Sequence, residues 1–478
     1  MTILRIVWKE NSMNHLVQLL HVFGLSVSLI ASGLAAEANP GQAKAVVEIK
    51  NLGGRVYDDK SPDKQVIDVV LFKTKVTDSE LANLSGFSKL QRLTLTDTQV
   101  TDAGLLHLKG LTQLKVLFLD DTKVSDDGLI HLEGLAKLSC LILTRTNVTD
   151  AGLVHLKGLV QLQSLFLDET KVSDAGLIHL SRLTQLQSLH LGRTRVSDAG
   201  LVHLERLSQL QSLLLGGTQL TDAGLVHLEG LLQLQSLDMG GTKVTNAGLV
   251  HLERLPQLEC LCLGNTQVSD SGMVYLRGLS QLQSLDLGGT WVTDAGLVHL
   301  NGLSQLEYVN LENTQVSNVG MEHLAHLTRL KHLFLGKTNV TDAGLVHLRG
   351  LSQLQSLSLR ESKVTDDGLA HLKALTKIQW LNLPDTQVSD AGLAHLRGLS
   401  NLRTLILETT HVSDAGLIHL SGLTNLRVLY VGATKVTDAG AKALRKELPK
   451  CVVVVHKLVT HPTTTEGQVK AKDGAKPK

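Results

Sequence analysis

The stretch "TQVTDAGLLHLKGLTQLKVLFLD", residues 98–120, decides the fold because the chain keeps repeating it. Its first threonine returns every 24 residues from Thr74 to Thr434, with Ser362 as the single exception, which makes sixteen copies without insertion or deletion. Self-similarity at a period of about 20 to 50 residues is typical of a solenoid, in which each repeat packs mainly on its neighbours. We therefore interpret most of the 478 residues as one stack of coils.

Each copy combines a strand pattern with a helix pattern, within the consensus LxxLxLxxTxVTDAGLxHLxxLxx. Leu93 and Leu95 alternate as in a strand, whereas Leu105 and Leu108 are three residues apart, as on one face of a helix. One strand and one short helix per coil stack the strands in parallel, about 4.8 Å apart. Because helices are wider than strands, we predict an α/β horseshoe of 16 repeats with a parallel concave sheet and short convex helices.

This pattern resembles that of leucine-rich repeat proteins over residues 66–456. Its VTDAGL segment is similar to the subtype found in exported bacterial leucine-rich repeat proteins and in the repeat region of F-box substrate receptors. The resemblance implies the horseshoe fold. Two features depart from it: threonine replaces the usual Asn or Cys where the chain leaves the strand, and no F-box precedes the repeats, which argues against a ubiquitin-ligase role.

The first 36 residues are typical of a secretory signal peptide. Arg5 and Lys9 precede the apolar stretch HLVQLLHVFGLSVSLIASGLA, and small residues allow cleavage after Ala35 or Ala38. The alternative is an uncleaved membrane anchor, because the apolar stretch is nearly long enough to span a bilayer. We expect the mature protein to be exported to the periplasm, the cell surface or the medium.

The repeats are expected to have a cap at each end. Residues 37–65 are interpreted as an N-terminal cap, with a helix that ends at Gly53 and Gly54, because an uncovered end coil would expose its core and an open sheet edge. Val452 to Val455 predict a closing strand. The polar, Lys-rich residues 457–478 are expected to be disordered.

Five positions hardly change between copies. Where the chain leaves the sheet, we expect the Thr98 hydroxyls to satisfy backbone groups that lack ladder partners, and the stacked copies to form a buried hydrogen-bond ladder. Thr101 and Asp102 are expected to cap the helix, with calcium binding by the Asp column as the alternative, although the glycine-rich nonapeptide of calcium-binding solenoids is absent. Gly104 predicts a close approach of the helix to the sheet. His107 recurs in thirteen copies, either as a structural residue or as part of a pH-sensitive convex surface.

The positions that vary between copies lie on the concave face, where strand side chains point away from the core. Most of the chain's aromatic residues fall on or beside these positions, and rings in an open groove are frequent anchors of binding sites. The alternative is simple packing between adjacent strands. The predicted ligand-binding residues are Phe118, Ile142, Phe166, His190, Leu214, Asp238, Asp286, Tyr308, Asn310, Phe334, Trp380 and Tyr430.

Catalysis, cofactors and nucleic acid find little support in the sequence. The net charge is +1, and the four cysteines match no zinc spacing, so we interpret Cys140, Cys260, Cys262 and Cys451 as free thiols without a metal. Asp238 and Asp286 flank Cys262 in neighbouring copies, but an open groove would not exclude water. We expect no catalytic residue and no enzyme activity.

The function that the sequence favours is recognition of a protein, peptide or glycan partner on the concave sheet. From Phe118 to Leu214 the groove is apolar, and from Asp238 to Asn310 it is acidic and polar, which suggests an extended ligand with one apolar end and one polar or basic end. Two alternatives remain open: an intracellular adaptor or inhibitor, and a purely structural spacer of the cell envelope.

Overall fold

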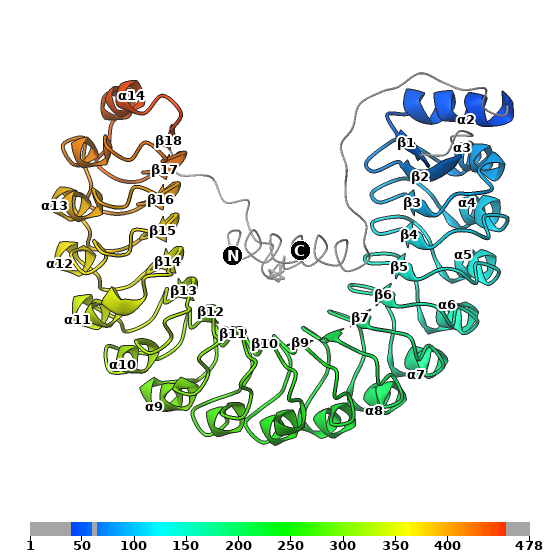
Figure 1. Cartoon of the computed structure of the whole chain (residues 1–478), viewed down its shortest axis with the longest axis horizontal. Coiled ribbons are helices and arrows are strands. Elements are labelled where there is room, and N and C mark those ends of the chain that lie inside the picture. Colours follow the sequence, from blue (N-terminus) through cyan, green and yellow to red (C-terminus); the bar gives the residue numbers. More distant parts are fainter. Residues whose placement is uncertain (1–39, 60–64, 456–478) are drawn as a thin grey trace, which may run out of the picture.

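The computed structural model describes residues 40–59 and 65–455. The expected signal peptide, residues 1–36, and the expected tail, residues 457–478, lie outside the described residues. The described part is a horseshoe with its strands along the inner rim and its helices along the outer rim, as expected (Figure 1). Within residues 40–59 and 65–455, none of the helices has both the length and the apolar character that crossing a bilayer requires.

The strands form one sheet that follows the concave side. From β2 onward each strand pairs in parallel with the next at a step of 24 residues, as in Arg92 with Val116, whereas β1 pairs antiparallel with β2 in the N-terminal cap. The strands are β1 Arg55–Asp58, β2 Val66–Val70, β3 Arg92–Thr94, β4 Val116–Phe118, β5 Cys140–Ile142, β6 Ser164–Phe166, β7 Ser188–His190, β8 Ser212–Leu214, β9 Ser236–Asp238, β10 Cys260–Cys262, β11 Ser284–Asp286, β12 Tyr308–Asn310, β13 His332–Phe334, β14 Ser356–Ser358, β15 Trp380–Asn382, β16 Thr404–Ile406, β17 Val428–Tyr430 and β18 Val452–Val454.

The convex side carries one short α-helix, one 3-10 helix or both in each coil. The α-helices are α2 Pro40–Asn51, α3 Asp78–Leu81, α4 Asp102–Leu105, α5 Asp126–Leu129, α6 Asp150–Leu153, α7 Asp174–Leu177, α8 Asp198–Leu201, α9 Asp294–Leu297, α10 Met321–Leu324, α11 Asp342–Leu345, α12 Asp366–Leu369, α13 Asp390–Leu393 and α14 Asp438–Glu447. The 3-10 helices are η1 Ala82–Gly86, η2 Leu106–Leu108, η3 Ile130–Leu132, η4 Val154–Leu156, η5 Ile178–Leu180, η6 Val202–Leu204, η7 Asp222–Leu228, η8 Gly248–Arg254, η9 Met273–Leu276, η10 Val298–Leu300, η11 Val346–Gly350, η12 Ala394–Leu396 and η13 Gly416–Leu420.

The core runs as one continuous column between the sheet and the helices. Seven apolar positions of each coil point into it, and in the coil of β4 all seven are fully buried: Leu117, Leu119, Val124, Leu129, Leu132, Leu135 and Leu138. Burying one such side chain stabilises a fold by about 1.5–3 kcal/mol. The repeated leucines therefore hold every coil against the next without disulfide bonds, and all four cysteines are free.

The corner where the chain leaves the strand differs from expectation in one respect. The Thr98 hydroxyl is buried and donates to the carbonyl of Leu95 in its own coil, at 2.6 Å, and its equivalents do the same. The prediction that the hydroxyl satisfies a backbone group is therefore confirmed, whereas a ladder from one stacked hydroxyl to the next was wrong, because each hydroxyl bonds within its own coil. The residue before each threonine is left-handed in all sixteen coils, with φ of +57° at Asp121, although only three of these residues are glycine.

The aspartate column joins coils rather than capping its own helix. Asp150 Oδ1 accepts from the Ser173 backbone N–H at 2.6 Å, and Oδ2 accepts from the Ser173 hydroxyl at 2.5 Å, one coil further on. The expected capping role of the carboxylate was wrong, because the backbone at the next helix start is a closer donor. Helix capping by the Ser/Thr column is present in part: the Thr149 hydroxyl accepts from Ala151 N–H at 3.3 Å.

The glycine column follows from this joint. A Cβ on Gly176 would lie 2.5 Å from Asp150 Oδ1 and 3.0 Å from Leu153 Cδ1. The column does mark a close approach, but to the carboxylate and the leucine of the preceding coil, so the predicted approach to the sheet was wrong.

The histidine column lies on the convex side and partly bridges coils. His155 Nδ1 lies 2.7 Å from Glu133 Oε1, and His227 Nδ1 lies 2.6 Å from Glu205 Oε1. These side chains are about a quarter exposed, so they cover the outer surface rather than fill the core. Whether the column senses pH stays a hypothesis, which thermal melts at pH 5 and pH 8 would test.

Candidate functional site

The concave face presents two rows of side chains. The middle residue of each strand, such as Leu117, points into the core, so the first and third residues face the groove. One row consists of the first strand residues, Val116 and its equivalents, which include Tyr308 and Trp380. The other row consists of the third strand residues, Phe118 and its equivalents. All twelve residues predicted from the sequence fall in these two rows of the same sheet.

The predicted residues differ in how much of their surface a ligand could reach. Five of them are less than 9% exposed and pack against neighbouring strands: Ile142, Phe166, Tyr308, Asn310 and Phe334. The other seven are half-buried: Phe118, His190, Leu214, Asp238, Asp286, Trp380 and Tyr430. The packing interpretation therefore applies to the first group, whereas the second group keeps surface that a partner could contact.

Rings on the concave face form two clusters. Phe166 stacks on His190 with centroids 3.9 Å apart and an interplanar angle of 7°. Further along the sheet, Phe334 lies between Tyr308 and Trp380, at centroid distances of 5.4 and 5.9 Å. Such contacts add about 0.5–1.5 kcal/mol each beyond area burial, so the rings stiffen the groove as well as lining it.

Two other aromatic residues are exposed outside the strands of the sheet. Trp291 follows Thr290, forms an isolated bridge with Ser269 and is 58% exposed, and Phe72 follows β2 and is 50% exposed. Neither belongs to the two rows of the sheet.

The centre of the groove is acidic. Asp238 Oδ1 accepts from the Gly240 N–H at 2.8 Å, and Asp286 Oδ1 accepts from the Gly288 N–H at 2.8 Å. The Asn310 amide also donates to Asp286 Oδ1, at 2.9 Å. Burial raises the pKa of Asp286 to about 6 and also raises the pKa of Asp238. Amide donors fix the positions of these carboxylates, so a cationic group of a partner would form a charge-assisted hydrogen bond with them.

The glycines beside this centre make room for it. A Cβ on Gly216 would lie 2.7 Å from Asp238 Oδ2, and one on Gly288 would lie 2.7 Å from the Asn310 amide. These glycines lie in the turn that follows each strand, and the left-handed position is the next residue, such as Gly217 at φ +71°.

Two polar residues of β7 and one that follows β6 line up in the order of a hydrolase triad. Ser188 Oγ lies 3.2 Å from His190 Nε2, and His190 Nδ1 lies 3.7 Å from Asp168 Oδ2. However, the Ser188 side chain is only 3% exposed, and its backbone N–H donates to the Gln163 carbonyl at 3.0 Å. A nucleophile needs access and free oxyanion donors, so this arrangement serves as a polar floor of the groove.

The cysteine in the acidic centre is a poor nucleophile. Burial raises the pKa of the Cys262 thiol well above its ordinary range, and the flanking carboxylates Asp238 and Asp286 act in the same direction. The thiolate is the reactive form of cysteine, so this thiol stays protonated and unreactive at neutral pH.

A buried ionic contact spans two coil steps further along the groove. Arg360 Nε lies 3.2 Å from Glu312 Oε1, and the Ser358 hydroxyl donates to the same oxygen at 2.9 Å. Gly336 lies between the two partners, and a Cβ there would be 2.6 Å from Arg360 Cγ. Glu312 is therefore occupied within the fold and offers little to a ligand.

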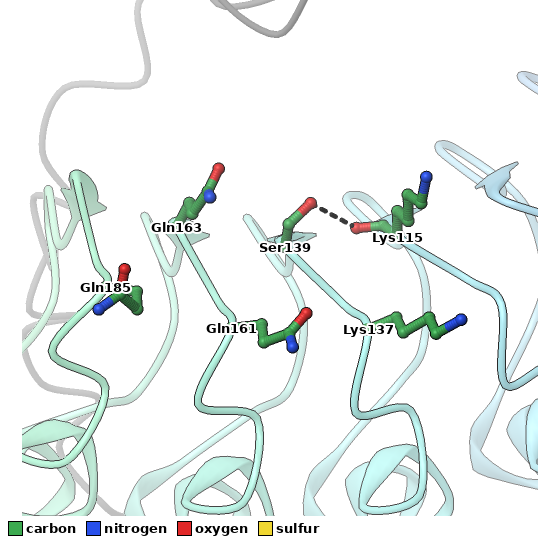
Figure 2. Close-up of a pocket in the computed structure, with 6 residues that line it drawn as sticks. All are labelled: Lys115, Lys137, Ser139, Gln161, Gln163 and Gln185. Atoms are coloured by element: carbon green, nitrogen blue, oxygen red, sulfur yellow. Dashed lines mark hydrogen bonds between the residues drawn. The ribbon is translucent and has the colours of Figure 1, made fainter.

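A hollow that the sequence reasoning missed lies at the amino ends of the strands. Figure 2 shows two rows of polar side chains from adjacent coils, which line a shallow depression of about 550 Å³: Lys115, Lys137, Ser139, Gln161, Gln163 and Gln185. The recurring QLQSL sequence, as at residues 161–165, could have indicated this hollow, because its two glutamines flank a buried leucine. The sequence prediction considered strand residues only and therefore omitted the glutamines before the strands.

No group of three or more His, Cys, Asp or Glu side chains within residues 40–59 and 65–455 is arranged to hold a metal ion. Both Asp150 carboxylate oxygens already accept hydrogen bonds from the next coil, as described above. The aspartate column is therefore occupied by the fold.

Comparison with known proteins identifies the class of fold. A family model described as "Leucine Rich repeat" matches residues 279–300, which span β11 and α9. A leucine-rich repeat protein of Leptospira interrogans is similar in structure, with 20% identity, a TM-score of 0.53 and coverage of 79% of this chain and 99% of that chain. The comparison with curated proteins found no matching sequence.

Two further solved structures share the fold. One is the ectodomain of the Arabidopsis receptor kinase HAESA in complex with an IDA peptide hormone, with 17% identity, a TM-score of 0.54 and coverage of 87% and 77%. The other is the functional domain of InlJ from Listeria monocytogenes, with 18% identity, a TM-score of 0.50 and coverage of 77% and 73%. The chain therefore has the leucine-rich repeat fold, as its repeat pattern predicted.

Proposed function

We propose that this protein is a non-catalytic recognition scaffold that binds a protein or peptide partner on its concave sheet. The observation that carries the proposal is the contrast between a nearly constant core and the two varied rows that face the groove. The HAESA ectodomain, which shares the fold, is described in complex with a peptide hormone, and this supports a polypeptide partner.

The half-buried residues of the groove indicate what the partner would contact. Phe118 and Leu214 offer apolar surface on β4 and β8, and Asp238 and Asp286 offer carboxylates on β9 and β11. With strands about 4.8 Å apart, β4 and β9 are on the order of 24 Å apart along the sheet. An extended segment of about seven or eight residues spans that distance, with apolar side chains at one end and a basic side chain at the other.

A site-specific photo-crosslinker tests this proposal directly. Benzoylphenylalanine replaces Leu214 in the groove or, as a matched control, Val202 on the convex side, which is 43% exposed. We expect one polypeptide to crosslink at position 214 and not at position 202, and Asp238→Lys to reduce that crosslink at least tenfold. Equal crosslinking at both positions, or none at position 214 in extracts of the source cells, would favour the structural spacer.

We also propose that the mature protein is exported, since residues 1–36 have the order of features of a signal peptide. Sequencing the N-terminus of the protein purified from its source tests this. A start at Ala36 or Asn39 is expected. A chain that retains Met1 and fractionates with the cell interior would favour the intracellular adaptor or inhibitor.

A further inference from the structure

The polar hollow at the amino ends of the strands is separate from the concave groove and has its own chemistry. Gln163 and Ser139 are half-buried and immediately precede β6 and β5. Gln161 and Gln185 are exposed, and each lies three residues before the first residue of its strand, β6 for Gln161 and β7 for Gln185. Figure 2 shows the three glutamine side chains together at one end of the hollow and the two lysines at the other. The site therefore has an amide end and a cationic end.

The side chains of the hollow are available to a ligand. Among these six described residues, the one hydrogen bond that uses a side-chain atom runs from the Ser139 hydroxyl to the Lys115 carbonyl, at 3.1 Å (Figure 2). The Lys137 ammonium is held in place by Gln113 Oε1 at 2.6 Å, outside the lining. The three glutamine amides thus keep their donors and acceptors for solvent or for a ligand.

We propose that this hollow binds an acidic oligosaccharide, with sugar hydroxyls on the glutamine amides and a carboxylate on Lys115 and Lys137. A hydroxyl both donates and accepts, and so does a primary amide, which makes Gln161, Gln163 and Gln185 suitable partners for a polyol. The ammonium groups supply a charge-assisted contact for one acid group. A volume of about 550 Å³ has room for a short oligosaccharide.

The lining favours a sugar over an apolar ligand or a peptide side chain. Pockets for apolar small molecules are lined mainly by hydrophobic and aromatic side chains, whereas all six lining residues here are polar. An acidic peptide would need the lysines but would leave the glutamine end without a matching partner. The amides therefore carry the specificity, and the lysines add affinity.

The chain contains a matched control in which the lysines are missing. Five coils later, the same six positions are occupied by Gln235, Gln257, Glu259, Gln281, Gln283 and Gln305. This equivalent surface keeps the amides but has one acid and no lysine, so it should not bind an acidic ligand. A variant with Gln281→Ala, Gln283→Ala and Gln305→Ala removes amides there without touching the hollow.

Affinity electrophoresis of the full chain in native gels tests the proposal. The probes cast into the gel are polygalacturonate, neutral dextran and polyglutamate. We expect polygalacturonate to retard the protein and the other two polymers to leave its mobility unchanged. The variant Gln161→Ala/Gln163→Ala/Gln185→Ala and the variant Lys115→Gln/Lys137→Gln should each lose the retardation, while the matched control variant should keep it.

Three results would overturn the proposal. The first is unchanged mobility of the wild-type protein in polygalacturonate. The second is equal retardation by polyglutamate, which would indicate an acidic peptide or general charge attraction. The third is retardation that the glutamine variant retains although its circular dichroism and melting temperature match the wild type. Because none of these residues lies in the concave rows, the crosslink at position 214 is expected to be unaffected in both variants.

Discussion

Replacing Asp150 measures how strongly one coil is held to the next. Its two carboxylate oxygens accept from the backbone N–H and the hydroxyl of Ser173, at 2.6 and 2.5 Å. A hydrogen bond to a charged group contributes about 1.5–3 kcal/mol, and an unpaired buried donor costs about 1–3 kcal/mol. Since this joint is only partly buried, we expect Asp150→Ala to lower the local free energy of unfolding by about 2–4 kcal/mol.

The chain itself supplies the conservative variant for this experiment. Asn246 occupies the equivalent position, where its Oδ1 accepts from the Ser269 N–H at 2.7 Å and its amide donates to the Ser269 hydroxyl at 2.8 Å. We therefore expect Asp150→Asn to keep both contacts with neutral partners and to lose only about 1 kcal/mol.

Hydrogen exchange is the suitable assay, because a long repeat array need not unfold in one step. Amides of residues 164–181 should exchange at least tenfold faster in Asp150→Ala than in Asp150→Asn, while residues 380–400 should be unchanged in both. Urea unfolding followed by circular dichroism provides the global comparison. Equal exchange in the two variants would show that the carboxylate does not hold the joint.

Three further predictions follow from packing and burial. Gly176→Ala should destabilise by about 1–3 kcal/mol, because its Cβ would lie 2.5 Å from a carboxylate oxygen, whereas Gly158→Ala, with nothing within 4 Å, should be neutral or stabilising in thermal melts. Burial raises the pKa of Asp286 from 3.8 to about 6. The folded state therefore holds this proton more tightly than the unfolded state, and the free energy of unfolding should fall as pH rises from about 4 to about 6. Asp286→Asn should remove that part of the pH dependence of the melting temperature. Burial raises the pKa of Cys140 to about 12, so iodoacetamide at pH 8 should modify Cys140 and Cys262 only after denaturation, as mass spectrometry can show.

The fold was predictable because its determinants are periodic. The strand leucines, the spacing of Leu105 and Leu108 and the absence of insertions all predict the same stack, and tertiary contacts only repeat what one coil specifies. The error about Thr98 and the error about the aspartate column share one cause. A sequence shows which groups can form hydrogen bonds, but it does not show whether the nearest partner lies in the same coil or in the next.

The candidate site was predictable only in outline. The alternation around Leu117 places every predicted residue on the concave face, but the burial of Phe166 under the stacked ring of His190 depends on rotamers that no pattern specifies. The polar hollow was missed for another reason. Its residues lie just before the strands rather than within them, so a search restricted to strand positions passes over Gln161 and Gln163.

The joint between Asp150 and Ser173 also bears on how the length of this protein can change. If 24 residues from Ala151 to Asp174 were deleted, Asp150 would meet Ser197 at the same separation along the chain. Recombination between repeats of the gene could therefore remove or add whole coils, while the contact between each pair of neighbouring coils stays chemically the same. Partner preference could then diversify by shuffling complete units, long before any individual side chain is replaced.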